Sequence, residues 1–157
     1  MQMNRKLLLE RWTSIEKIMN EYAQVAGLTS MGLTVLGIIY GIPQGCTQKQ
    51  ICERSHYNKQ TVNMIIKSLW EQGYVELTEM KEDRRNKQVK LSADGKEYAD
   101  KVIGFMLEAE MSPWEKLTEN QQKLLMEFGD AYEQGYQKAI AALKRALNKE
   151  EKRSQVE

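Results

Sequence analysis

The feature that most constrains the fold of this chain is a charged turn between two short segments of alternating apolar and polar residues. These segments are residues 74–79 and 88–92, and the residues between them include Asp83, Arg84 and Arg85. Alternation with a period of two is typical of half-buried β-strands, and a polar loop between two such strands predicts a β-hairpin. We therefore expect one hairpin with a cationic tip.

Two short helices are predicted directly before this hairpin. Thr47 and Gln50 have the spacing of a capping box, which opens the first helix. Asn58 is a favourable N-cap for the second helix, and Gly73 is the glycine expected after its C-terminus. Two helices at this spacing, followed by a hairpin, predict a winged helix-turn-helix.

Longer helices are predicted on both sides of this unit. In residues 4–26, apolar side chains recur at alternating steps of three and four residues, so they would lie along one side of a helix. Thr29 or Ser30 is expected to cap a second helix that ends near Tyr40, and Ser92 is expected to cap another after the hairpin. The predicted fold class is therefore mainly α with a small β-hairpin wing.

The C-terminal part is expected to form one more long helix. Ser112-Pro113 should interrupt or end the helix before it, because proline has no backbone N–H. Thr118 and Gln121 repeat the capping-box spacing and should open the final helix. The charged residues 149–157 are expected to fray as a tail.

Charge is distributed unevenly along the chain, although the net charge is only +1. Residues 46–96 contain ten Lys or Arg and seven Asp or Glu, a balance of +3, whereas residues 97–157 contain nine and twelve, a balance of −3. This modest asymmetry suits a nucleic-acid-binding face joined to a separate assembly region.

The sequence gives no sign of export or of a membrane partner. No stretch reaches the roughly eighteen apolar residues of a membrane-spanning helix. The leucine run at residues 7–9 is not followed by a small-residue cleavage site. We therefore expect a cytoplasmic protein in which both cysteines, Cys46 and Cys52, are reduced.

The helix after Asn58 is the best candidate for reading DNA. Its apolar residues share an inward face, which leaves an outward face of Lys59, Gln60, Asn63, Met64 and Lys67. Gln and Asn side chains can pair with adenine in the major groove, and Lys can reach guanine or phosphate. The N-terminal residues of such a helix lie deepest in the groove, which favours Lys59, Gln60, Thr61 and Asn63. The alternative is the polar outer face that any soluble helix has.

The hairpin tip supports the same interpretation. Arg84, Arg85 and Lys87 could place cations in the adjacent minor groove or along phosphates, and Asp83 could orient one arginine by a salt bridge. The alternative is a solvated charged turn.

Residues 47–95 resemble the MarR family of winged-helix transcriptional regulators. The resemblance is carried by residues 47–54 (TQKQICER), 58–62 (NKQTV) and 69–75, and by Asp83-Arg84-Arg85 spaced before Val89, Leu91-Ser92 and Gly95. It implies a homodimer whose two recognition helices enter successive major grooves of a pseudo-palindrome. It also implies one regulator domain over residues 1–157, with residues 29–95 as the DNA-binding winged helix and residues 1–28 and 113–148 as dimerisation helices.

The chain departs from the family pattern at three positions. His56 stands where the turn between the motif helices usually carries glycine, and histidine tolerates a positive φ better than most residues. Met64 stands where members often carry a polar or arginine side chain. Ser92 replaces the more usual threonine and should cap equally well.

Our sequence-based hypothesis is a sequence-specific regulator, a repressor that a small-molecule effector releases from DNA. The predicted DNA-binding residues are Thr47, Lys49, Asn58, Lys59, Gln60, Thr61, Asn63, Met64, Lys67, Asp83, Arg84, Arg85 and Lys87. The expected partners are double-stranded DNA, a second copy of the chain and a small apolar or aromatic effector. Candidate residues for the effector pocket are Trp12, Met19, Tyr22, Tyr40 and Tyr57.

Two alternatives stay open. The first is a helical interaction module that kept the winged-helix fold and lost specific DNA binding. The second is a redox-sensing regulator that uses Cys46 or Cys52. An enzyme is not expected, because no set of acid, base and nucleophile can be assembled, and with His56 as the only histidine we expect no multi-histidine metal site. No cofactor is expected either, since a glycine-rich phosphate loop is absent from the sequence.

Overall fold

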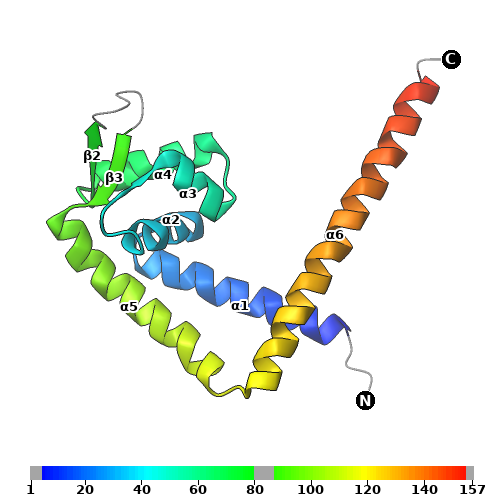
Figure 1. Cartoon of the computed structure of the whole chain (residues 1–157), viewed down its shortest axis with the longest axis horizontal. Coiled ribbons are helices and arrows are strands. Elements are labelled where there is room, and N and C mark those ends of the chain that lie inside the picture. Colours follow the sequence, from blue (N-terminus) through cyan, green and yellow to red (C-terminus); the bar gives the residue numbers. More distant parts are fainter. Residues whose placement is uncertain (1–4, 80–86, 155–157) are drawn as a thin grey trace. The chain divides into compact units, whose positions relative to one another are not determined.

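The computed structural model describes residues 5–79 and 87–154, and these residues form a mainly helical fold with one small sheet (Figure 1). The elements in chain order are α1 (Arg5–Val25), α2 (Ser30–Tyr40), β1 (Cys46–Thr47), α3 (Gln48–Ser55), α4 (Lys59–Glu71), β2 (Val75–Glu79), β3 (Lys87–Leu91), α5 (Ala93–Glu115) and α6 (Glu119–Ser154). The chain divides into two compact units, residues 1–107 and 108–157. The predicted fold class, mainly α with a small hairpin, is confirmed.

The predicted hairpin is present and gains a third strand. Strands β2 and β3 are antiparallel, with Val75 opposite Leu91 and Leu77 opposite Val89. Strand β1 pairs with the other edge of β3, where Cys46 lies opposite Val89, so the strand order is β1-β3-β2. Strand β1 was not predicted, because two residues are too short for alternation to be recognised.

Every helix cap expected around the central unit is present. Thr29, rather than Ser30, caps α2, since its hydroxyl accepts a hydrogen bond from the Gly32 N–H at 3.0 Å. Thr47 and Gln50 form the predicted capping box at the start of α3. Ser92 Oγ accepts from the N–H of Gly95 at 2.9 Å, which satisfies a free donor in the first turn of α5.

The turn between α3 and α4 depends on a left-handed histidine. His56 has φ 58° and ψ 17° and ends α3, and among the described residues it is the one non-glycine residue with positive φ. Histidine visits this region more readily than most side chains. The expectation that His56 replaces the usual glycine is therefore confirmed.

The core of residues 1–107 consists of two buried clusters that share α2. The first packs α2, α3 and α4 against the sheet, through Val35, Ile39, Cys46, Ile51, Val62, Ile66, Leu69, Val75 and Val89. The second packs the end of α1 and the first half of α5 against the other side of α2, through Ala23, Leu33, Leu36, Ala99 and Ile103. Helix α2 therefore supports the motif helices directly and connects them with α1 and α5.

Two C-terminal boundaries differ from the sequence-based prediction. Pro113 does not interrupt α5, which continues to Glu115, because the missing proline N–H removes only one bond close to the end of the helix. Helix α6 begins with the predicted capping box of Thr118 and Gln121. It continues to Ser154, beyond Lys149 where fraying had been expected, because Lys, Glu and Arg are good helix formers.

None of the described helices, taken singly, has both the length and the apolar character needed to cross a membrane.

Candidate nucleic-acid interface

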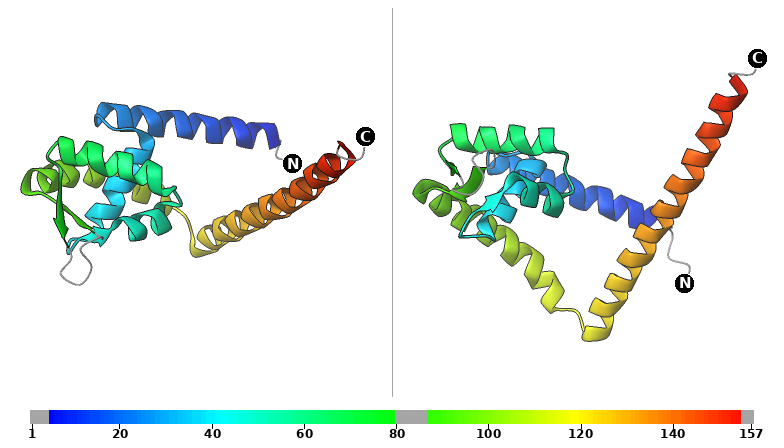
Figure 2. Two further views of the ribbon diagram at one scale, coloured as in Figure 1. Left: turned by 90° about the horizontal axis from the view of Figure 1, so that it is seen from above. Right: turned by 45° about the horizontal axis from the view of Figure 1, so that its top comes forward.

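Helix α4 lies at the surface of residues 1–107 (Figure 2). One of its faces is buried and the other is exposed. Val62, Ile66 and Leu69 are buried in the core, as their spacing predicts. The exposed face carries the five residues predicted to point outward, which are Lys59, Gln60, Asn63, Met64 and Lys67. Thr61, which was also predicted to contact DNA, is half-buried.

The N-terminal end of α4 is held in place by side chains of two elements. The side-chain oxygen of Asn58 accepts a hydrogen bond from the Thr61 N–H at 2.8 Å, and this caps the helix. Gln48 of α3 donates its amide to the Lys59 carbonyl oxygen at 3.1 Å. These contacts fix the N-terminal end of α4 and connect it with the start of α3.

Two residues predicted to contact DNA have a structural role in this unit. Thr47 is half-buried, and its hydroxyl accepts from the Gln50 N–H at 3.2 Å. Asn58 uses its oxygen for the α4 cap. Both residues position the motif helices, and their contact with DNA stays a prediction.

The exposed lysines of the motif helices are held only loosely. Lys49 lies 3.8 Å from Glu53, and Lys67 lies 3.6 Å from Glu71, each one helical turn further along. Exposed pairs of this kind are worth about 0–1 kcal/mol, so either ammonium group can turn toward a stronger anion.

The hairpin lies next to these helices in the same unit. Lys87, the first residue of β3, is exposed and lies opposite Glu79. The Gln88 amide donates to the Gln44 carbonyl oxygen at 2.9 Å, which ties β3 to the loop before β1. Asp83, Arg84 and Arg85 lie outside the described residues, so their contact with DNA stays a prediction.

A close junction fixes the hairpin against the start of α5. Ser92 donates through Oγ to the Gly73 carbonyl oxygen at 2.6 Å and through its N–H to that of Tyr74 at 3.1 Å. The rings of Tyr74 and Tyr98 stack with centroids 4.1 Å apart. Gly95 is buried against the Tyr74 carbonyl, a contact that a side chain would prevent.

The structure distributes the five predicted effector residues over different surroundings. The Tyr22 hydroxyl donates to the Val102 carbonyl oxygen at 2.6 Å, and the Tyr57 hydroxyl lies 3.4 Å from Thr34 Oγ1. Met19 is exposed and Trp12 is half-buried. Tyr22 and Tyr40 border the cluster shared by α1, α2 and α5, whereas Tyr57 packs against the cluster beneath the motif helices.

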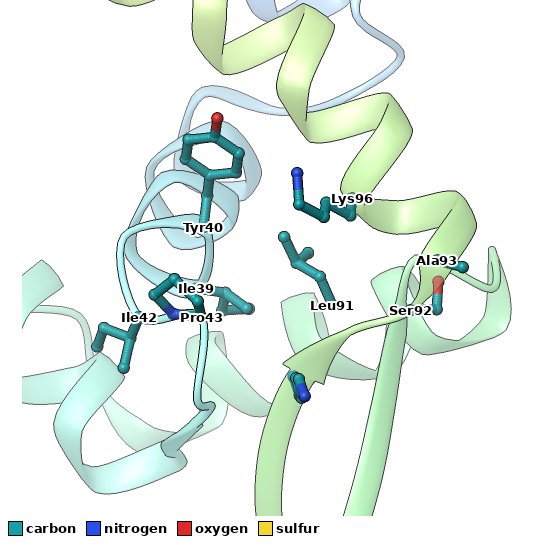
Figure 3. A pocket seen from close by; sticks show the side chains of 9 residues that line it. Ile39, Tyr40, Ile42, Pro43, Leu91, Ser92, Ala93 and Lys96 are labelled. Carbon is teal, nitrogen blue, oxygen red and sulfur yellow. The ribbon is translucent and has the colours of Figure 1, made fainter.

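Tyr40 lines a cavity of about 390 Å³ that sequence reasoning missed (Figure 3). Its walls come from the end of α2, the end of β3 and the start of α5, and they comprise Ile39, Tyr40, Ile42, Pro43, Lys90, Leu91, Ser92, Ala93 and Lys96. Figure 3 shows Tyr40 projecting from α2 and Lys96 from α5, with Leu91 of β3 below Lys96. No local sequence pattern connects these segments, which explains why the cavity was not predicted.

Asp100 links Tyr40 and Lys96, two of the polar residues that line this cavity. Tyr40 donates its hydroxyl to the Asp100 carboxylate at 3.0 Å, and Lys96 donates to it at 2.7 Å. These hydrogen bonds lower the pKa of Asp100, and the one from Lys96 has the larger effect. The same contacts raise the pKa of Lys96 and of Tyr40, because the carboxylate favours the protonated form of each. The cavity therefore presents an ammonium group and a protonated phenol.

The two cysteines differ in burial. Cys46 lies in the core, and burial raises the pKa of its thiol, with a smaller opposing effect from Arg54. Cys52 is half-buried. A buried thiol with a raised pKa forms little thiolate, the reactive species.

The two capped motif helices, the exposed face of α4 and the antiparallel hairpin define a winged helix-turn-helix protein. A family model described as the MarR family matches residues 26–86. A MarR family regulator from Neisseria meningitidis is 26% identical to this chain over 87% of it and 95% of that protein, with a TM-score of 0.69. Residues 26–86 are therefore similar to the MarR family, and the chain as a whole shares the fold of these regulators.

Two further solved structures share the fold at lower identity. The S. aureus MepR–DNA complex is 16% identical, covers 87% of this chain and 99% of its own, and has a TM-score of 0.68. A MarR/EmrR family transcriptional regulator from Acinetobacter sp. ADP1 is 18% identical, covers 88% and 99%, and has a TM-score of 0.65. No curated protein matches the chain.

Proposed function

We propose that this chain is a sequence-specific DNA-binding transcriptional regulator that works in the cytoplasm as a homodimeric repressor. The observation that carries the proposal is the exposed face of α4, where Gln60, Asn63 and two lysines project from a helix whose ends are capped. The match to the MepR–DNA complex supports it, because that protein with the same fold was solved on DNA.

In the proposed complex, α4 enters the major groove. Gln60 and Asn63 offer side-chain amides, each of which can make two hydrogen bonds to an adenine edge. Lys59 and Lys67 supply cations for guanine or phosphate, and Lys49 of α3 supplies one for the backbone. The arginines of the hairpin would then reach the adjacent minor groove, where negative potential is strong.

The apolar surface of α6 supports assembly from two copies. Leu125, Phe128, Tyr132, Tyr136, Ile140, Leu143 and Leu147 recur at steps of three and four, and each of these side chains is at least 38% exposed in the single chain. An apolar stripe of this length on a soluble helix is stable when a second helix covers it. Two copies would place two α4 helices on half-sites about 34–36 Å apart, which a pseudo-palindromic operator provides.

The cavity beside Tyr40 is the proposed effector site. Its wall is mostly apolar, from Ile39, Ile42 and Leu91, and it also includes two cations, Lys90 and Lys96, of which Lys96 pairs with Asp100. Those features suit a small apolar or aromatic molecule that carries one negative charge. Because the cavity joins β3 to α5, a bound molecule that fits only one arrangement of these elements would shift the equilibrium toward it.

Lys96 offers a direct test of this effector site. Compounds of this class that release DNA from the wild type should release it poorly from Lys96→Met. Lys101→Met is the matched control, because Lys101 is also exposed on α5 and pairs with Glu97 at 2.9 Å. An equal response of both variants would contradict the assignment of the cavity.

To test the proposed function, duplexes that bind the protein are selected from random DNA. The affinity of the protein for the selected duplexes is then measured by mobility shift at several salt concentrations. We expect a two-fold symmetric site and an affinity that falls steeply with salt, since phosphate contacts release counterions. Asn63→Ala should relax the base preference at one position per half-site, whereas Lys59→Ala should weaken binding to all sequences. Gln134→Ala, an exposed α6 substitution, should do neither.

Failure of the selection to enrich any sequence would overturn the proposal. That result, together with an intact fold, would favour the alternative of an interaction module that lost specific DNA binding.

A further inference from the structure

Met64 is an apolar residue on the exposed face of α4, between polar residues of the same helix. It is 65% exposed on α4, with Gln60 one turn before it and Lys67 nearly one turn after it. At 100° per residue these three side chains form one line along the helix, opposite buried Leu69 and Val62. Met64 therefore does not belong to the core, and its neighbours along this line of the helix, Gln60 and Lys67, carry groups that make hydrogen bonds.

We propose that Met64 reads thymine by packing against its C5-methyl group in the major groove, which makes it a specificity-determining residue of this chain. The inference rests on the proposed DNA binding. On the base edges of the major groove, the thymine methyl is the apolar group that a side chain can contact, and all other readable groups donate or accept hydrogen bonds. The thymine methyl is therefore the group in the major groove that an exposed thioether of α4 complements.

The residues on either side of Met64 make the prediction more specific. Gln60 and Asn63 carry amides suited to adenine, so the same helix face pairs adenine readers with a thymine reader. We therefore infer that each half-site contains an A·T-rich step under the centre of α4, with a thymine methyl facing Met64. The flexible, unbranched Met side chain can adjust to such a contact without a unique geometry.

A second surface near Met64 suggests a different role. Met64 and Met31 both line a cavity of about 560 Å³ between α2 and α4, together with Leu28 and Ile65. If Met64 served mainly to hold a molecule there, substitution of Met31, which is 45% exposed, would have the same effect as substitution of Met64. Comparison of the two residues therefore separates the two roles.

The test replaces each thymine of the selected half-site, one at a time, by deoxyuridine, which lacks only the methyl group. For the wild type, one such replacement should reduce affinity about fourfold per half-site, because burial of one methyl-sized group contributes about that much to the binding affinity. Met64→Ala should bind the thymine and deoxyuridine duplexes equally, and Met64→Leu should keep most of the difference. Met31→Ala should show the full wild-type difference.

Any of three results would overturn the proposal. In the first, no thymine of the half-site is sensitive to the loss of its methyl group. In the second, Met64→Ala keeps the wild-type sensitivity. In the third, Met31→Ala loses it. Each requires specific binding by the wild type, whereas absence of specific binding to any duplex refutes the proposed function instead.

Discussion

Replacement of Gly95 by alanine should destabilise the fold strongly, because the start of α5 passes directly over the Tyr74 carbonyl. A Cβ atom on Gly95 would lie 1.8 Å from that oxygen, and contacts below 3.0 Å are essentially never tolerated. The two segments would have to separate by about 1.2 Å to reach even that limit. Such a movement would disrupt the two hydrogen bonds of Ser92 to the Gly73 and Tyr74 carbonyl oxygens.

The magnitude follows from these contacts. Overpacking costs about 1–3 kcal/mol, and loss of each hydrogen bond costs about 1 kcal/mol. Alanine returns about 1 kcal/mol through its higher helix propensity. The net loss in the free energy of unfolding is therefore about 2–4 kcal/mol, which in a chain of this size lowers Tm by roughly 4–16 °C.

Thermal unfolding followed by far-UV circular dichroism measures this effect. Gly104→Ala is the matched control, since Gly104 lies in the same helix and a Cβ atom there meets nothing within 4 Å. The control should raise Tm slightly. A Tm of Gly95→Ala equal to or above that of the wild type would refute the close approach of α5 to the strand.

Two further predictions concern assembly and the cysteines. Leu143→Glu should raise the dimer dissociation constant at least about tenfold, because a charge replaces an apolar contact. Analytical ultracentrifugation measures this, and Gln134→Glu, on the opposite side of α6, should have no effect; equal values for both variants would argue against the stripe as the interface. Native alkylation by iodoacetamide should be slower at Cys46 than at half-buried Cys52, because burial raises the Cys46 pKa and thiolate forms only as the pH rises. Peptide mass spectrometry follows both sites, and faster modification of Cys46 at neutral pH would support the redox-sensing alternative.

Local features of the fold could be predicted from the sequence because their partners are close along the chain. The caps formed by Thr47, Asn58 and Thr118 join a side chain to a backbone group three residues ahead, so residue type and spacing are sufficient. The exposed face of α4 followed in the same way from the helical period. The position of His56 in the turn came from the resemblance to the family.

The tertiary structure decided where distant segments meet. Alternation indicates that Val89 is buried, but only folding places it opposite Cys46 as part of a third strand. Tyr22, Tyr40 and Tyr57 were grouped by their chemistry, yet Tyr22 and Tyr40 border the cluster of α1, α2 and α5, and Tyr57 borders the cluster beneath the motif helices. The cavity around Tyr40 arises from three segments without a common pattern. A sequence pattern specifies which face of an element avoids water, and the contact between two such faces depends on the packing of the whole unit.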